Sequence, residues 1–461
     1  MLREPEQTTS VKGRKTGTLV PVLPIRQYDP IALAHELVVP GDFAETGVNS
    51  NVAVYGATGS GKTTSITKTQ LLHTNNESVV VALSKKADVE LFTFLLKRRG
   101  YEVDIIDFQA PYKSTVGYDP LMEVETRRDI AELSREIVYA GGEASFKTDP
   151  FWDEASVSLT NSMISATLER YENAVACIDP KELQPELHPT LEDAADLLFD
   201  LIFAEDGHSG FTASNLDAEM EALKQLDPSS YAARNFAALQ KLAPRTVSCV
   251  LSTAKVAMDK VLSPAAVEIS RQLPKIDLSK LGKKKSALFI LTTPTQTSTS
   301  AFTSILYSRI FKALLDEAAT KPNGELDVPV KLLLDDLACG DPVPNLGKNL
   351  SICRAAGISV EFFLQSKAQL RILYGEREAQ IIIDNCDTQI FMSNNDLETA
   401  HELSLRLDVP LSEALNIPLA KEVVARRGSN ATILPRYQTL EDPEYIALMK
   451  QMEIGEEDRT E

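Results

Sequence analysis

The sequence is short of cysteine and has no long apolar stretch. Its five cysteines show neither C-x-x-C pairs nor the Cys/His spacing of a zinc site, which disfavours both a structural zinc ion and a disulfide framework. No run approaches the roughly eighteen consecutive apolar residues of a membrane span. The opening segment, MLREPEQTTS, lacks the apolar core of a signal peptide. These absences favour a protein of a reducing compartment.

Positive charge is also scarce. The 47 Lys and Arg residues against 66 Asp and Glu residues give a net charge of −19 at pH 7. Such a chain is unsuited to coating nucleic acid in general, but it is compatible with DNA in one locally basic channel or with an acidic face that docks a basic partner. A hydrophobic content of 43% and a charged content of 25% are typical of a globular protein. The length of 461 residues predicts two or three structural units.

Apolar runs alternate with helical segments in two parts of the chain. The runs SVVVAL, EVDIIDF, SALFILTT, VKLLL, ISVEFFL and DTQIFMS are typical of buried strands. Alternation of strands and helices predicts an α/β fold with a mostly parallel sheet flanked by helices. Between the two parts, residues 122–270 have almost entirely helical periodicity, which predicts an inserted all-α domain.

Five units follow from this pattern. We predict an N-terminal tail and lead-in (1–47), a first part of the nucleotide-binding domain (48–121), an all-α insert (122–270), a second part of the nucleotide-binding domain (271–410) and a C-terminal extension that ends in an acidic, disordered tail (411–461).

The segment GATGSGKT, residues 56–63, matches the G-x-x-x-x-G-K-[ST] pattern of a P-loop. The strand-like NVAVY precedes it and a helical segment follows, which is the context that the pattern requires. Successive backbone N–H groups of such a loop, with the N-terminus of the next helix, bind phosphate groups. The predicted nucleotide-binding residues are Gly56, Thr58, Gly59, Ser60, Gly61, Lys62, Thr63 and Thr64. Lys62 would reach the outer phosphates of ATP, and the Thr63 hydroxyl would ligate Mg²⁺.

Two carboxylates end the apolar run VKLLLDD. Asp335 is the predicted second ligand of Mg²⁺, and Asp336 lies where hydrolysing ATPases place the acid that orients the attacking water. Gln365 ends the strand ISVEFFL and would point toward the nucleotide. By pattern alone, Gln365 is either a sensor of the γ-phosphate or an ordinary strand-end glutamine, and Arg354 is a surface arginine.

The chain resembles the type IV secretion coupling proteins of the TraG/TraD group, which are ATPases of bacterial conjugation. The resemblance extends over residues 48–410. It is carried by the P-loop, VGYDPL, DPFWDEA, LLLDDLA and the long segment from SICRAAGIS to ELSLRL.

The resemblance implies a RecA-like P-loop NTPase that assembles as a homo-hexamer when active, with a monomer in isolation as the alternative. It implies a DNA-translocating ATPase that moves single-stranded DNA and its attached relaxase to a type IV secretion channel. Lys62, Asp336, Gln365 and Arg354 match catalytic positions of the family, and Arg354 would reach into the ATP site of a neighbouring subunit. We expect a cytoplasmic protein, with a peripheral position at the inner face of the cell membrane as the alternative.

Two departures from the family stand out. Family members usually carry N-terminal membrane helices, whereas this chain has no transmembrane segment in its sequence, and Asp336 replaces the usual glutamate. A second hypothesis is therefore an ATP-binding recruiter of protein substrates with little motor activity. A third is a duplex-DNA translocase of the FtsK/HerA kind.

Overall fold

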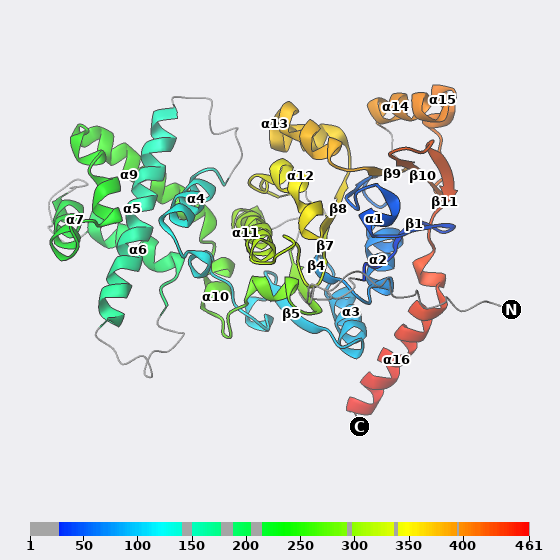
Figure 1. The fold of residues 1–461 in the computed structure, drawn as a ribbon, viewed down its shortest axis with the longest axis horizontal. Helices are drawn as coiled ribbons and strands as arrows, with labels where there is room; N and C mark the ends of the chain where they lie inside the picture. Colours follow the sequence, from blue (N-terminus) through cyan, green and yellow to red (C-terminus); the bar gives the residue numbers. More distant parts are fainter. Residues whose placement is uncertain are drawn as a thin grey trace, which may run out of the picture.

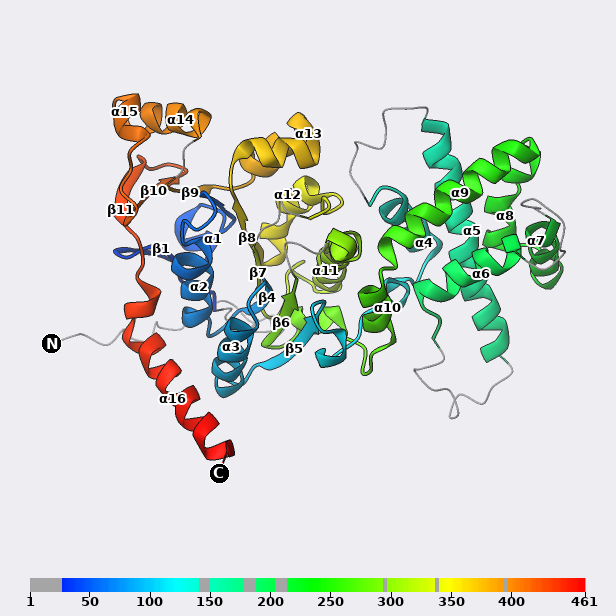
Figure 2. The same cartoon turned by 180° about the vertical axis from the view of Figure 1, so that it is seen from behind.

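The computed structural model of the protein describes residues 27–140, 150–176, 188–203, 214–292, 297–335, 340–393 and 396–460. A central sheet with helices on both faces forms one part of the molecule, and a block of helices lies to one side of it (Figures 1 and 2). The protein thus has an α/β fold with an inserted all-α domain, as the alternation of apolar runs and helical segments predicts.

The described residues contain a sheet of nine strands, in the order β11-β10-β9-β3-β8-β7-β4-β6-β5. Neighbouring strands from β9 to β5 in this order are parallel, and the pairs β9-β10 and β10-β11 are antiparallel. The strands are β3 (Val52–Tyr55), β4 (Ser78–Leu83), β5 (Glu102–Asp107), β6 (Ser286–Leu291), β7 (Val330–Leu334), β8 (Ile358–Leu364), β9 (Thr388–Met392), β10 (Lys421–Arg426) and β11 (Thr432–Pro435). Every apolar run named above is one of the parallel strands.

Both faces of the inner parallel strands β3, β4, β6, β7 and β8 are buried, which explains why their sequences are mostly apolar, whereas the edge strand β5 is partly exposed. Side chains of successive strand residues point to opposite faces. On β4, Val79 and Val81 belong to one hydrophobic cluster, and Val80 and Ala82 belong to another. The first cluster includes side chains of α2 (Lys68–His73), α3 (Lys86–Arg98) and α16 (Pro443–Thr460). The second includes side chains of α11 (Ser300–Ala319), α12 (Leu346–Ala356) and α13 (Lys367–Asp384).

The all-α insert is organised around its longest helix. The helices are α4 (Arg127–Val138), α5 (Pro150–Val175), α6 (Leu191–Phe203), α7 (Ser214–Leu226), α8 (Tyr231–Phe236), α9 (Pro244–Val261) and α10 (Pro264–Arg271). Helix α5 packs against α4, α6, α8 and α9. Its apolar residues Ala155, Leu159, Met163 and Ala166, which recur at three- and four-residue spacing, are buried. The start of α6 is capped as its sequence predicts, because Asp193 accepts hydrogen bonds from the backbone and hydroxyl of Thr190 at 2.6 and 2.9 Å.

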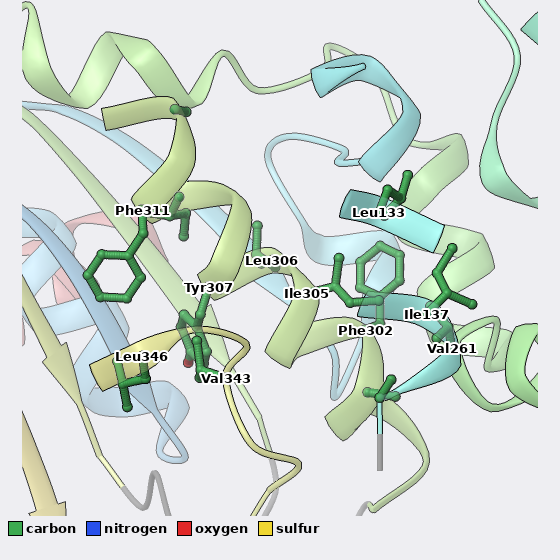
Figure 3. Packing of buried hydrophobic residues seen from close by; sticks show 14 of the residues in the cluster. Leu133, Ile137, Val261, Phe302, Ile305, Leu306, Tyr307, Phe311, Val343 and Leu346 are labelled. Atoms are coloured by element: carbon green, nitrogen blue, oxygen red, sulfur yellow. The ribbon is translucent and has the colours of Figure 1, made fainter. Parts of the chain in front are cut away.

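Helix α11 joins the insert to the sheet. Its apolar residues, among them Phe302 and Ile305, pack with Leu133 and Ile137 of α4 and with Val261 of α9 (Figure 3). The same interface contains a buried ion pair.

In that ion pair, Nη2 of Arg309 on α11 donates to Glu136 of α4 at 2.7 Å, and Arg309 is 0% exposed. The hydroxyl of Ser308 donates to the same carboxylate at 2.6 Å. Burial raises the pKa of Glu136, and the Arg309 charge opposes that rise. Polar as well as apolar contacts therefore hold the insert to α11.

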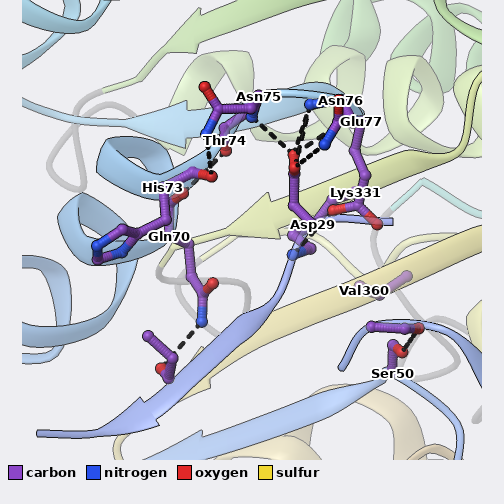
Figure 4. Close-up of polar contacts among 12 residues, drawn as sticks. Asp29, Ser50, Gln70, His73, Thr74, Asn75, Asn76, Glu77, Lys331 and Val360 are labelled. Atoms are coloured by element: carbon purple, nitrogen blue, oxygen red, sulfur yellow. Dashed lines mark hydrogen bonds and ion pairs between the residues drawn. The ribbon is translucent and has the colours of Figure 1, made fainter. Parts of the chain in front are cut away.

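Part of the predicted N-terminal lead-in is folded onto the sheet. Strands β1 (Ile31–Ala34) and β2 (Leu37–Val39) form an antiparallel hairpin, and α1 (Phe43–Thr46) follows. The carboxylate of Asp29 accepts backbone hydrogen bonds from Asn75, Asn76 and Glu77, at 2.8, 2.9 and 3.1 Å (Figure 4). These bonds and the packing of Ile31 and Leu33 on the sheet order this segment, while residues 1–26 lie outside the described residues.

The C-terminal extension also differs from its sequence-based prediction. After α14 (Leu397–Leu407) and α15 (Leu411–Ala414), strands β10 and β11 extend the sheet, and α16 follows. Helix α16 extends to Thr460 and so includes residues of the predicted acidic tail, whose disorder stays a prediction. The helix begins with residues that pack on α3, among them Tyr445 and Leu448, and this anchored start favours continuation of the helix.

Among the described residues, none of the helices combines the length and the apolar character that a membrane span requires.

Candidate functional site

The glycine-rich loop lies at the carboxyl edge of the parallel strands, directly after β3. Gly59 and Gly61 have φ angles of +75° and +89°, a backbone conformation that favours glycine. A Cβ atom on Gly56 would lie 2.5 Å from the Ser60 hydroxyl, so the first glycine permits close packing of the loop on itself. The loop leads into a single π-helical turn, η1 (Thr63–Thr67), and then into α2. Backbone and helix N-terminus are thus arranged as an anion site requires.

Lys62 lies over this loop. Its side-chain Nζ donates to the carbonyl oxygens of Gly56 at 2.7 Å and Ala57 at 3.2 Å, and the residue is buried. Thr58 and Gly59 form the exposed tip of the loop, and the hydroxyl of Ser60 donates to the sulfur of Met392 at 3.9 Å. The loop is therefore packed along its base and open at its tip.

Thr63 and Asp335, the two predicted metal ligands, lie together. The Thr63 hydroxyl donates to Oδ2 of Asp335 at 2.6 Å, although 272 residues separate them. Asp335 follows β7 directly, so the carboxyl end of that strand brings its carboxylate to the loop. Burial raises the pKa of the neighbouring Tyr307, and the Asp335 charge adds to the rise. A hydroxyl and a carboxylate are hard oxygen donors of the kind that Mg²⁺ prefers, so this pair fits a magnesium ion.

The order of the strands places Gln365 between the loop and Asp335. Strand β8, which ends at Leu364, lies between β3 and β7. The backbone N–H of Gly56 donates to the carbonyl of Leu364 at 3.0 Å, so Gln365 follows directly at the base of the loop. The side chain of Gln369 bonds both the backbone N–H and the side-chain oxygen of Gln365, at 3.3 and 3.2 Å. The predicted catalytic glutamine thus lies at the same edge as the loop.

Of the other two predicted catalytic residues, the structure describes only Arg354, which does not lie at this edge. Asp336 lies outside the described residues. Arg354 is in the last turn of α12, before β8 begins, and its guanidinium carbon lies 4.2 Å from the centre of the Phe43 ring. Since β8 has seven residues, at about 3.3 Å per residue it places Arg354 at the opposite edge of the sheet from the loop of its own chain.

Two residues of the C-terminal extension that the sequence did not mark as site residues contact the loop region. The guanidinium of Arg436 donates to the carbonyl of Ser60. The hydroxyl of Thr439 donates to the carbonyl of Thr64 at 2.6 Å. Neither residue belongs to a motif, and no sequence signal could have connected them to a loop more than 370 residues away.

Solved structures of the plasmid coupling protein TrwB and of VirB4 have this fold. The plasmid coupling protein TrwB in complex with an ATP analogue matches with a TM-score of 0.62 and 18% identity, over 91% of this chain and 92% of TrwB. TrwB in complex with ADP and Mg²⁺ matches with a TM-score of 0.60 and 19% identity, over 84% of each chain. VirB4 of Thermoanaerobacter pseudethanolicus matches with a TM-score of 0.53 and 12% identity, over 92% of this chain and 99% of VirB4. The fold is that of a RecA-like P-loop NTPase.

Sequence comparison extends this finding beyond the fold. No curated protein sequence matches the chain. The sequence model of the family described as "Type IV secretory system Conjugative DNA transfer" matches residues 16–407. This match covers well over half of the chain, and it includes the glycine-rich loop, Asp335 and Gln365. The protein therefore belongs to the type IV secretory system conjugative DNA transfer family.

Proposed function

We propose that this protein is a coupling ATPase that hydrolyses Mg-ATP to move single-stranded DNA, with its attached relaxase, to a type IV secretion channel. The observation that carries the proposal is the 2.6 Å contact between the Thr63 hydroxyl and the Asp335 carboxylate, beside a complete P-loop. Family membership supports conjugative DNA transfer as the process. The complexes of TrwB with ADP and Mg²⁺ and with an ATP analogue support the choice of nucleotide and metal.

Each residue of the site has a defined task in this proposal. The N–H groups of the loop bind the phosphates, and Lys62 exchanges its bonds to Gly56 and Ala57 for bonds to the outer phosphate oxygens. Thr63 and Asp335 hold Mg²⁺, which neutralises phosphate charge when bound. Gln365 contacts the γ-phosphate end, and Asp336 orients the attacking water. The chain thus supplies positioning and charge, which are the main needs of phosphoryl transfer.

The decisive experiment measures ATP hydrolysis with and without single-stranded DNA. We expect turnover that single-stranded DNA stimulates several-fold or more in the wild type, and that Lys62→Ala abolishes, because the outer phosphates lose their cation. Lys97→Ala, which removes an exposed lysine of α3, is the control and should behave as the wild type. Phosphate contacts also predict that stimulation weakens as salt rises.

Two other outcomes favour the alternative functions. Tight ATP binding with no DNA-dependent turnover at any protein concentration would indicate a recruiter of protein substrates. Stimulation by duplex DNA but not by single strands would indicate a translocase of the FtsK/HerA kind. Either result would contradict the single-stranded DNA motor.

The position of Arg354 leads to a prediction about assembly. It is exposed and lies away from the P-loop of its own chain, as expected of an arginine that acts on a neighbour in a ring. We expect Arg354→Ala to lower kcat strongly while the affinity for ATP stays unchanged, since the arginine stabilises only the charge of the transition state.

A mixing experiment tests this role directly. Arg354→Ala and Lys62→Ala should each be nearly inactive, but a ring of both contains sites with an intact Lys62 on one subunit and an intact Arg354 on the next. A site is complete only where a subunit with an intact Lys62 lies next to a subunit with an intact Arg354. In an equal, random mixture each condition is met about half of the time, so about a quarter of the wild-type sites should be restored. Mixing Lys62→Ala with Arg377→Ala, an exposed arginine of α13, controls for subunit exchange. The absence of restoration in exchanging rings would contradict a role in trans.

A further inference from the structure

Arg436 is a buried arginine where the C-terminal strand pair meets the P-loop. Because β10 is antiparallel to β9 and β11 is antiparallel to β10, β11 ends at the carboxyl edge of the parallel strands. Arg436 is the first residue after β11, and it is 8% exposed. Its Nε donates to the carbonyl of Lys421 at 3.2 Å, and its Nη1 donates to the carbonyl of Ser60. The strand pair therefore delivers a cation to the base of the loop.

The bond to Ser60 fixes the orientation of a peptide group in the loop. In a trans peptide, the C=O and N–H groups point in opposite directions. Arg436 holds the Ser60 carbonyl, so the N–H of Gly61 points away from Arg436. Gly61 also presents its bare Cα to the guanidinium, since a Cβ there would lie 3.5 Å from Nη1. The arginine thus constrains one of the N–H groups that the proposed function assigns to phosphate binding.

The charge of Arg436 is largely retained beside the loop. Burial lowers the pKa of Arg436, and the charge of Glu422 of β10, which is 1% exposed, opposes that change. Burial raises the pKa of Glu422 to about 8, so the carboxyl is mostly protonated at neutral pH. In the described structure, Oε2 of Glu422 and Nη2 of Arg436 have no hydrogen-bond partner. A guanidinium stays protonated even when buried, and its field therefore favours an anion at the loop.

A second contact ties the same extension to the start of α2. Thr439 donates to the carbonyl of Thr64 at 2.6 Å and shares a hydrogen bond of 2.6 Å with the hydroxyl of Thr69. The two contacting residues lie three positions apart along the extension, and they bond the middle and the end of the phosphate-binding segment, at Ser60 and Thr64. Helix α16, which follows, packs on α3 and provides a rigid attachment.

We infer that Arg436 is a positioning residue for nucleotide binding. It holds the Ser60–Gly61 peptide so that the Gly61 N–H faces the phosphates, and it supplies a permanent positive charge behind the loop, on the side opposite that N–H. The inference rests on the proposed binding of Mg-ATP, and it makes the C-terminal extension part of the nucleotide site.

The test compares Arg436→Met with Arg427→Ala by calorimetric titration of the full chain with Mg-ADP and with a non-hydrolysable ATP analogue. Arg427 is the matched control, because it lies on the same extension but bonds Asp387 and the carbonyl of Gly47. A hydrogen bond to a charged group contributes enough to predict a roughly 10- to 100-fold rise in Kd for Arg436→Met. Arg427→Ala should bind as the wild type. In hydrolysis, KM should rise more than kcat falls, since loop amides bind phosphate in the ground state and the transition state alike.

Chemical rescue separates positioning from general stability. Millimolar guanidinium should restore nucleotide binding to Arg436→Ala, whereas urea, its neutral analogue, should not, and neither should rescue Lys62→Ala. If Arg436→Met does not fold, the double variant Glu422→Gln/Arg436→Met, which removes both buried ionisable groups, is used for the same titration. A Kd within about twofold of the wild type in these variants would overturn the inference, since the expected loss is tenfold or more. A wild type that binds no Mg-ADP would instead refute the proposed function itself.

Discussion

Replacing Asp335 with asparagine should reduce Mg-dependent ATP hydrolysis by roughly 10²–10³-fold, because a metal ion contributes several kcal/mol to charge stabilisation in phosphoryl transfer. The substitution keeps the size of the side chain and an oxygen that can accept the 2.6 Å bond from Thr63. It removes the negative charge that attracts Mg²⁺. The concentration of Mg²⁺ needed for half-maximal activity should therefore rise, and a magnesium titration of the residual activity measures that shift.

Asp107→Asn is the matched control for this prediction. Asp107 also ends a parallel strand, β5, but its carboxylate accepts hydrogen bonds from the backbone of Gln109 and Ala110, at 2.9 Å each. An asparagine oxygen can make the same bonds, so hydrolysis and its magnesium dependence should stay at the wild-type level. If Asp335→Asn kept more than about a tenth of the activity at unchanged magnesium dependence, Asp335 would not be a metal ligand.

Replacing Glu136 with alanine should lower the free energy of unfolding by about 3–5 kcal/mol, because Arg309 would be left as a buried charge without its partner. Arg309 is 0% exposed, and the insert packs on α11 around this pair. Scanning calorimetry should therefore show a lower Tm, and native-state hydrogen exchange should show the earliest loss of protection in α4 and α11.

Two further variants test whether burial of the Glu136–Arg309 pair is the reason for the large loss of stability. Glu154→Ala removes another glutamate–arginine pair, with Arg135 at 3.0 Å, but both side chains are 52% exposed, so the cost should stay below about 1 kcal/mol. The double variant Glu136→Leu/Arg309→Met replaces the buried pair with apolar side chains and should recover most of the stability. A similar Tm loss for Glu136→Ala and Glu154→Ala would contradict the argument.

Local sequence determined the parallel sheet and the phosphate-binding loop of this protein. Strands such as β4 and β6 are buried on both faces, and burial on both faces requires continuous apolar runs that can be recognised without a structure. The loop residues 56–63 are close in sequence, and each position has a local reason, such as the positive φ of Gly59 and Gly61. Asp335 was predictable because a carboxylate at the end of a parallel strand meets the other strand ends at one edge.

The elements that the sequence did not predict depend on distant partners. Strands β1 and β11 have only four residues each, and β10 joins the sheet by pairing with β9, from which α14 and α15 separate it in the chain. Arg354 lies away from its own P-loop because it precedes β8, whose carboxyl end is at the loop. No sequence motif indicates this arrangement.

Only the tertiary structure brought Arg436 to Ser60 and Glu136 to Arg309, since 376 and 173 residues separate the members of these pairs. A local pattern can specify which backbone conformation a segment adopts and which face it buries, because those depend on residues within a few positions. The pairing of two side chains across such distances depends on the packing of whole elements, and the chain must fold before that geometry exists.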